Sequence, residues 1–375
     1  MLGACSTISP SPSQQPSGGP NSTAPSATAA ATLSPTPEPT PNGVYGWTVS
    51  GRLAPAIAGL SPRVYVANEH SGDVAVIDPA TLKVIDRYKT GKYPEHVVPD
   101  WDLSKLYVNN MSSSTITVID PVTSKPTGEI LAATTPYDLY YTPDGSKAIV
   151  VNDYINPDNM KFNGLNFYDR ATWKFLKFLV VPWIGADDLD MSADGSFLMI
   201  SCEYSGMVAR VDTKAMTVTG SVKVGSLPRD VRLGPDGKLF FVTNEGRAGV
   251  SVIDPEQMKE INFIKTGAGA HAIEFSRDLT QMYVLNRSVG TVSVIDLATQ
   301  TVVATWQEGR SPDEMTLSVD GTQAWFSDRY HGGVTVMDTR TGAILATIPT
   351  GDHPHGITYW PQPGLHSIGQ NGNMR

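Results

Sequence analysis

The sequence predicts an all-β fold: a seven-bladed β-propeller of four-stranded antiparallel blades. A unit of roughly 42 residues recurs seven times between Pro62 and Gly364. Each copy carries short runs of β-branched residues that end at turn residues. Units with only three or four short strands bury their apolar faces when neighbouring units pack against one another, as the blades of a propeller do.

Each unit begins with a run of the form Tyr-Val-x-Asn, here called strand B. The clearest copies begin at Leu106, Phe240 and Met282. A Val/Ile-x-Val-Ile-Asp run, strand C, follows at 74–78, 116–120, 250–254, 292–296 and 334–338. Units three and four carry less regular forms of it at 164–169 and 207–212. A turn, strand D and a further loop then lead to strand A of the next unit.

The order of these strands predicts how the ring closes. The first copy starts at a strand B, residues 64–68, and the last copy ends at a strand A, residues 356–359. One blade should therefore combine strands from both chain ends, which leaves no free sheet edge. Beyond it, residues 361–372 are expected to form an irregular closing segment with an exposed His366.

Several motifs resemble those of the YVTN-repeat β-propeller family. The resemblance rests on residues 65–68, 107–110 and 241–244, with recurring elements such as 192–195 and 228–231, and covers nearly the whole domain. It implies a bacterial surface or periplasmic protein, similar in fold to the propellers of secreted dehydrogenases, lactonases and haem-containing nitrite reductases. The shared motif residues are structural, so the resemblance implies little about chemistry.

The N-terminal region has a different composition. Residues 6–43 consist mainly of Ser, Pro, Thr, Ala and Gly, with Glu38 as the one charged residue. Such a segment buries too little apolar surface to fold, so it is expected to be a disordered tether. We therefore expect three parts: a signal-peptide remnant at 1–5, the tether at 6–43, and the propeller at 44–375.

The two cysteines have different expected roles. Residues 2–5, Leu-Gly-Ala-Cys, resemble a bacterial lipobox, although the charged and apolar regions that normally precede one are missing. We expect the given start to lie inside the signal peptide and Cys5 to be lipidated, which would anchor the domain outside the cytoplasm, in the periplasm or at the cell surface. A chance match is the alternative. Cys202 lies in a predicted strand and is expected to be a buried free thiol.

Charge and motifs exclude several classes of function. The net charge of −9, from 28 basic and 37 acidic residues, argues against broad binding to nucleic acid. No run of 18 apolar residues predicts a membrane span, so membrane contact is expected only through the lipid. Motifs of serine hydrolases, phosphate loops, zinc proteases and covalent haem are missing. No catalytic residue is predicted. Whether the protein is an enzyme stays open, and the lack of a catalytic motif favours a non-enzymatic role.

Seven aligned loops between strand D and strand A give two columns of variable, mostly titratable residues. The first column is Glu95, Tyr137, Asp187, Arg229, His271, Asp313 and His355; the second is His96, Asp138, Asp188, Asp230, Ala272, Glu314 and Gly356. Strand starts from all blades converge at the mouth of a propeller channel. Both columns except Ala272 and Gly356 are therefore candidate ligand-binding residues. A mouth filled only with water is the alternative.

Three imidazoles in these columns could hold a divalent metal. His96, His271 and His355 come from separate blades, so no local spacing motif supports the assignment. The sequence therefore identifies no cofactor, and a divalent metal is a candidate.

Further polar residues are expected on the same face. An insertion at 155–164, with Met160, Lys161 and Phe162, lies between strands B and C of the third unit. The other loops of this kind carry Glu69, His70, Glu203, Tyr204, Arg287, Arg329, Tyr330 and His331.

Together these features favour a binding module that takes a protein partner or a small polar ligand at this face. One alternative is a metal-assisted lactonase- or lyase-like enzyme that uses His271, His355 and His96 with Glu95 or Asp187. Another is a haem- or redox-linked accessory propeller with an imidazole as axial ligand.

Overall fold

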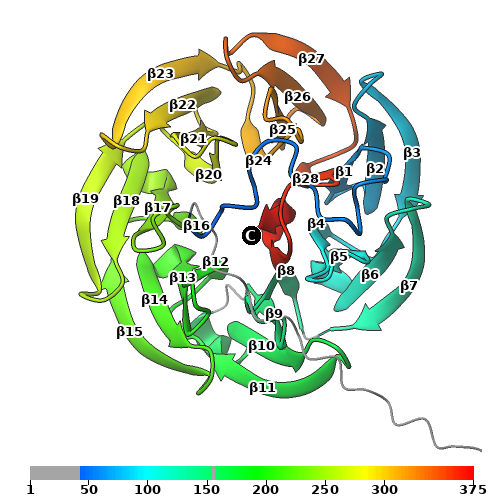
Figure 1. Ribbon diagram of the computed structural model, residues 1–375. Helices are drawn as coiled ribbons and strands as arrows, with labels where there is room; N and C mark the ends of the chain where they lie inside the picture. Colours follow the sequence, from blue (N-terminus) through cyan, green and yellow to red (C-terminus); the bar gives the residue numbers. More distant parts are fainter. Residues whose placement is uncertain (1–42, 133, 154–156) are drawn as a thin grey trace, which may run out of the picture. The chain divides into compact units, whose positions relative to one another are not determined.

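The computed structural model describes residues 43–132, 134–153 and 157–375, and these residues form the predicted seven-bladed propeller (Figure 1). Residues 1–42, which include Cys5 and nearly all of the expected tether, lie outside the described residues. Each blade is an antiparallel sheet whose strands A to D run outward from the channel.

The innermost strands A are β4 (Pro94–Pro99), β8 (Pro136–Tyr141), β12 (Ala186–Met191), β16 (Pro228–Leu233), β20 (Ala270–Phe275), β24 (Pro312–Leu317) and β28 (Pro354–Trp360). Strands B are β1 (Arg63–Asn68), β5 (Leu106–Asn110), β9 (Lys147–Asn152), β13 (Phe197–Cys202), β17 (Phe240–Asn244), β21 (Gln281–Asn286) and β25 (Gln323–Asp328).

Strands C are β2 (Asp73–Asp78), β6 (Thr115–Asp120), β10 (Gly164–Asp169), β14 (Met207–Asp212), β18 (Gly249–Asp254), β22 (Thr291–Asp296) and β26 (Gly333–Asp338). The outer strands D are β3 (Lys83–Lys89), β7 (Lys125–Leu131), β11 (Lys174–Val180), β15 (Thr217–Lys223), β19 (Lys259–Lys265), β23 (Thr301–Gln307) and β27 (Ile344–Pro349).

Burial falls from the channel to the rim. Strands β12 and β13 are buried along their whole length, whereas β3 alternates between exposed and half-buried residues. Cys202, the last residue of β13, is a buried free thiol, as the sequence predicted. The apolar core therefore lies between neighbouring blades, as expected for units that cannot bury their faces alone.

Strands from the two ends of the domain close the ring. Strand β28 pairs antiparallel with β1, with Tyr65 opposite Thr358 and Arg63 opposite Trp360. Blade 1 is thus β28-β1-β2-β3, which confirms the predicted closure. Blades 2 to 7 follow in chain order, from β4-β5-β6-β7 to β24-β25-β26-β27.

The C-terminal tail is more ordered than predicted. It forms β29 (Ser367–Gly369), a 3-10 turn η5 (Gln370–Gly372) and β30 (Asn373–Met374), and β29 pairs with β8 through Gly369 and Tyr140. The expectation of an exposed His366 is wrong, because its ring stacks on Trp101 with ring centroids 3.9 Å apart and is half-buried.

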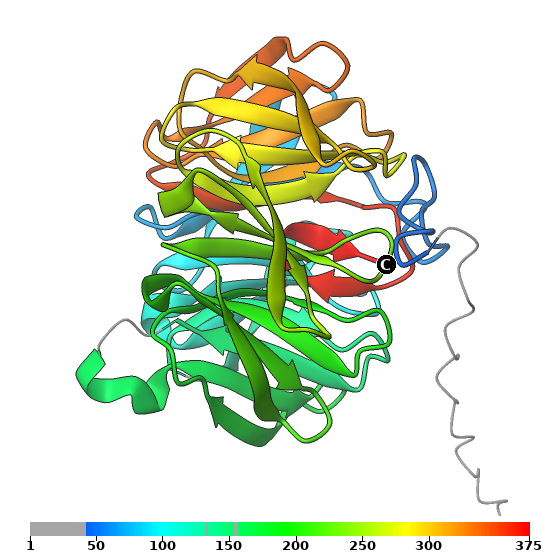
Figure 2. The ribbon, with the colours of Figure 1, turned by 90° about the vertical axis from the view of Figure 1, so that its left-hand side faces the viewer.

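The tail and the segment before β1 close one end of the channel. Figure 1 shows the tail at the centre of the ring, and Figure 2 shows it beside residues 43–60 on the face opposite the 3-10 helix η2 (Pro157–Phe162). Arg375 Nη2 donates to Asp190 Oδ1 at 2.6 Å, and the Tyr45 hydroxyl donates to the Leu233 carbonyl at 2.9 Å. The open mouth is therefore on the side of η2.

No helix among the described residues is long and apolar enough to cross a membrane.

We predict that Arg375→Met lowers the free energy of unfolding by about 3–5 kcal/mol, because it leaves the buried Asp190 carboxylate without its cation. The side chains of this pair are 9% and 0% exposed. Urea denaturation would measure the change. Arg340→Met is the matched control, since the 75% exposed Arg340 side chain pairs with Asp338 at the surface and its loss should cost about 1 kcal/mol or less. Equal effects of the two substitutions would contradict the role given to the tail.

Candidate functional site

A β-bulge brings both sequence columns to the channel. In six blades, the first-column and second-column residues of strand A together lie opposite one residue of strand B. In blade 3 only Tyr137 is inserted, and Asp138 is paired with Val151. Adjacent residues of a regular strand point to opposite faces. A bulge interrupts that alternation and bends the strand, so neighbours such as Asp187 and Asp188 can both contribute to the channel.

The mouth contains a cavity of about 270 Å³. Six residues of the first column line it: Glu95, Tyr137, Asp187, Arg229, His271 and His355. The seventh, Asp313, is buried directly behind, where its carboxylate binds Arg287 at 2.5 Å and Arg329 at 3.1 Å. The structure thus brings the first column together at one site.

A third column, which was not predicted from the sequence as a column, completes the cavity. The residue immediately after strand B in each blade is Glu69, Met111, Asp153, Glu203, Glu245, Arg287 or Arg329. Five of these line the cavity, and Glu69 and Glu245 bind its arginines. Met111, Asp153 and Glu245 were missed, although their regular position in the repeat was a signal that could have found them.

The charged residues that line the cavity are unevenly distributed among the blades. Blades 5, 6 and 7 provide Arg229, Arg287 and Arg329. Blades 2, 3 and 4 provide Glu95, Asp153, Asp187 and Glu203, together with Tyr93, Tyr137 and Tyr204.

Carboxylates already surround the arginines. Arg229 contacts Asp187 at 3.5 Å, Glu245 at 3.0 Å and also Glu203. Arg329 binds Glu69 at 2.6 Å in addition to Asp313. Five of the seven carboxylates in the first and third columns therefore bind the three guanidinium groups, whereas Glu95 and Asp153 form no ion pair with an arginine among the described residues.

The pKa values separate carboxyl groups that burial favours in the protonated form from one that neighbouring cations keep ionised. Burial, reinforced by Asp187, raises the pKa of Asp153 to about 7 and that of Glu203 to about 8, although Arg229 opposes both shifts. Burial and the neighbouring Glu69 raise the pKa of Glu95 well above its ordinary value. By contrast, Arg287, His271 and Arg329 overcome burial and hold the pKa of Asp313 well below its ordinary value. Burial therefore outweighs the nearby cations at Glu95, Asp153 and Glu203, whereas the cations around Asp313 outweigh its burial.

The three histidines proposed as metal ligands are close but do not form one group. The ring centroids of His355 and His96 are 4.7 Å apart, and those of His355 and His271 are 6.4 Å apart. Ligand atoms of His355, Glu69 and Glu95 all lie within 4.8 Å of one another, and the same holds for His96, Asp138 and Asp188. His271 belongs to neither group; its Nδ1 lies 2.9 Å from the Asp313 carbonyl.

The second column lies deeper than the first. His96, Asp138, Asp188, Asp230 and Glu314 are all buried, and none of them lines the cavity at the mouth. Ala272 is also buried, and at Gly356 a Cβ atom would lie 2.5 Å from the Glu95 carbonyl oxygen, so close packing explains the glycine there.

The rim residues divide between the cavity and the surface. Tyr204 and Tyr330 line the cavity, whereas His70 lies 3.6 Å from Asp352 at the exposed surface and His331 bonds to Ser311. In the insertion, η2 covers residues 157–162, and Lys161 lies over the Phe162 ring at 5.0 Å from its centroid. Residues 155–156 of the insertion lie outside the described residues.

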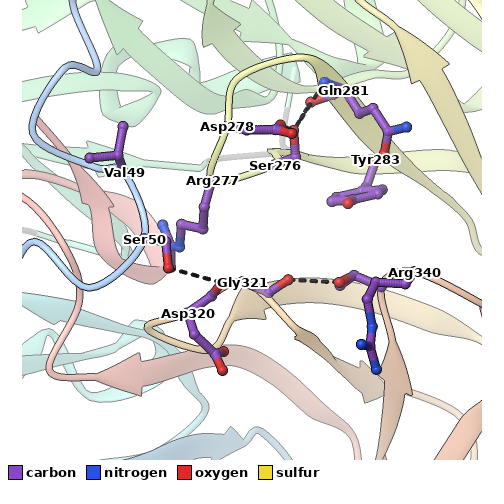
Figure 3. Close-up of a pocket in the computed structure, with 11 residues that line it drawn as sticks. Val49, Ser50, Ser276, Arg277, Asp278, Gln281, Tyr283, Asp320, Gly321 and Arg340 are labelled. Atoms are coloured by element: carbon purple, nitrogen blue, oxygen red, sulfur yellow. Dashed lines mark hydrogen bonds between the residues drawn. The ribbon is translucent and has the colours of Figure 1, made fainter.

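A larger cavity of about 650 Å³ lies on the closed face, between blades 6 and 7 (Figure 3). Polar side chains that line this cavity already form hydrogen bonds with the turns around it. Ser276 Oγ donates to Asp278 at 2.6 Å, and Ser50 Oγ donates to the Asp320 carbonyl at 3.2 Å. We therefore place the candidate site at the mouth, where charges remain unsatisfied.

Solved structures share this fold at low sequence identity. A protein of unknown function from Desulfotomaculum acetoxidans DSM 771 is 19% identical, with a TM-score of 0.67 over 79% of this chain and 98% of that one. The dihydro-heme d1 dehydrogenase NirN, in complex with DHE, is 15% identical, with a TM-score of 0.61 over 88% and 82%. Kuenenia stuttgartiensis hydrazine synthase is 20% identical, with a TM-score of 0.59 over 70% and 88%. These similarities support the fold alone.

No functionally curated protein matches the sequence. The model of the YNCE-like β-propeller family matches residues 47–362, which span all seven blades. The resemblance to a YVTN-type propeller is confirmed: the chain belongs to the YNCE-like β-propeller family.

Proposed function

We propose that the protein is an extracytoplasmic binding module, anchored through a lipid on Cys5, that takes a small organic cation into the channel mouth. The surplus of carboxylates over arginines in the cavity is the observation that carries this proposal. Glu95 and Asp153 are the central residues. Glu95 Oε2 has His355 Nε2 at 3.5 Å, and Asp153 Oδ1 has no hydrogen-bond partner among the described residues.

The shape and walls of the cavity suit such a ligand. Its volume is at the lower end for small-molecule sites, which fits a short amine or guanidine better than a large ligand. Tyr93, Tyr137, Tyr204 and Tyr330 line it, and aromatic rings attract cations through their faces. An anion would instead have to displace carboxylates that already bind all three arginines.

A second candidate is a metal-assisted lactonase- or lyase-like enzyme. The cluster of Glu69, Glu95 and His355 favours it, since one imidazole and two carboxylates can bind a divalent ion. A metal there would neutralise the same charges as an organic cation, so the two ligands should compete. The haem-linked alternative gains no support beyond a shared fold with NirN and hydrazine synthase.

We predict that putrescine, a small diammonium ion, binds with one site per chain by isothermal titration calorimetry, and that succinate does not. At pH 8.5, where Asp153 has lost its proton, Asp153→Asn should weaken the affinity for putrescine at least tenfold, about 1.4 kcal/mol, because it removes a negative charge from the cavity. Glu256→Gln is the matched control, since the carboxylate of Glu256 is 76% exposed, away from the mouth. Unchanged affinity in Asp153→Asn, or tighter binding of succinate, would contradict the proposal.

Binding of putrescine should strengthen as the pH rises from 6 to about 8.5. With pKa values of about 7 and about 8, Asp153 and Glu203 hold protons at pH 6 and release them over this range. Amines of this kind stay charged throughout, with pKa values near 10. Titrations in two buffers of different ionisation enthalpy would detect the released protons near neutral pH. Asp153→Asn should flatten the profile, and an affinity that falls with pH would refute this assignment.

The anchor can be tested separately. Mass spectrometry of the N-terminal peptide, isolated from membranes of the native host, should show acyl chains on Cys5. Cys5→Ser should move the protein to the soluble fraction without changing putrescine binding. An unmodified Cys5 in membrane-derived protein would exclude the anchor and leave the binding proposal intact.

A further inference from the structure

A second cluster of polar groups lies in the core of the channel, behind the mouth. Ligand atoms of His96 (β4), Asp138 (β8) and Asp188 (β12) lie within 4.8 Å of one another. The three side chains are at most 1% exposed and do not line the mouth cavity. This cluster is therefore distinct from the proposed binding site.

The tautomer of His96 follows from its hydrogen bonds. Asn371 Oδ1 accepts the backbone N–H of Ile357 at 3.2 Å, which identifies this atom as the amide oxygen. The same oxygen lies 3.3 Å from His96 Nδ1 and can only accept, so Nδ1 carries the proton. His96 Nε2 is then a bare lone pair, and it has no hydrogen-bond partner within the described ranges.

Asp138 is also incompletely satisfied. Asp138 Oδ1 accepts the backbone N–H of Leu139 at 2.7 Å, but Oδ2 has no hydrogen-bond partner among the described residues. Asp188 Oδ1 accepts the Tyr140 hydroxyl at 3.2 Å. A buried carboxylate oxygen without a hydrogen-bond partner destabilises the folded state.

More negative groups surround the cluster. Asp230 and Glu314 are buried close to Asp188, and Asp230 Oδ1 has no hydrogen-bond partner among the described residues. Arg232, a neighbour of Asp230, is already bound to Glu274 at 2.8 Å. Protons or a bound cation must therefore compensate the charge of these carboxylates.

We propose that His96, Asp138 and Asp188 bind a divalent metal ion of the Mn²⁺ or Zn²⁺ class in the core of the channel. A neutral imidazole nitrogen favours a transition metal over Ca²⁺ or Mg²⁺, which prefer oxygen ligands alone. Asn371 acts as a positioning residue, because metal-binding histidines usually donate their second ring N–H to an oxygen acceptor. Asn371 Nδ2 also donates to Glu314 at 2.7 Å, which connects the C-terminal tail to the same layer.

This site would have a structural consequence. Its three ligands come from the inner strands of three consecutive blades, so a bound ion would cross-link β4, β8 and β12 and indirectly hold the tail. Since a metal that binds only the folded chain stabilises it by mass action, loading should raise the unfolding temperature.

The test uses the full chain produced in minimal medium with added Mn²⁺ or Zn²⁺ and purified without chelator. Elemental analysis after dialysis should find one of these ions per wild-type chain. His96→Gln and Asp138→Asn should each reduce the content at least tenfold. Both replacements are close in volume, and the amide that Asp138→Asn introduces keeps an oxygen that can accept the Leu139 N–H. The metal-free Asp138→Asn variant should therefore unfold at a temperature no lower than that of metal-free wild type.

Glu95→Gln is the matched control at the mouth. It should keep the full metal content, whereas Asp138→Asn should keep putrescine binding, which separates this inference from the proposed function. A wild-type chain without either ion would overturn the inference. Loss of the ion in Glu95→Gln with retention in Asp138→Asn would overturn it as well, and would move the metal to Glu69, Glu95 and His355.

Discussion

The pairing of β28 with β1 is the constraint on which the rest of the structure depends. It joins the two ends of the repeat array and so fixes seven inner strands around one axis. Each inner strand begins with a bulge, and closure directs all seven bulges to the same opening. Residues as distant in sequence as Glu69 and Arg329 thereby form an ion pair at 2.6 Å. An open array would not assemble the site.

Charge balance distinguishes the two ends of the channel. At the closed end, the Asp190 carboxylate is compensated by Arg375 and by hydrogen bonds from the backbone and Tyr45. At the mouth and in the layer behind it, carboxylates outnumber the available cations, and Asp153 and Asp138 each keep an oxygen without a partner among the described residues. Buried charge of this kind lowers the stability of a fold and is common at functional sites. The two proposals assign it to two ligands of the same sign, an organic cation and a metal ion.

Part of the candidate site could be predicted by aligning the repeat. The first two columns were found because residues such as His271 and Arg229 vary at a position where a structural repeat should not. The same alignment contains the third column, but only four of its residues were predicted, and only as separate loop residues. Asp153 was missed because it lies beside an insertion that obscures the spacing. The grouping of His96 with Asp138 rather than with His271 depends on distances between blades, which no local spacing encodes.

The sequence by itself determined the architecture, since a recurring pattern of strand-forming and turn residues leaves a blade no other way to bury its faces than against its neighbours. It also determined which strands close the ring. Tertiary structure decided the depth of each column, the partners of each arginine and the protonation of His96, because these depend on side chains from different blades. It also decided the role of the tail: residues 367–374 show no repeat signal, yet they form a hairpin beside β8 and place Asn371 against His96.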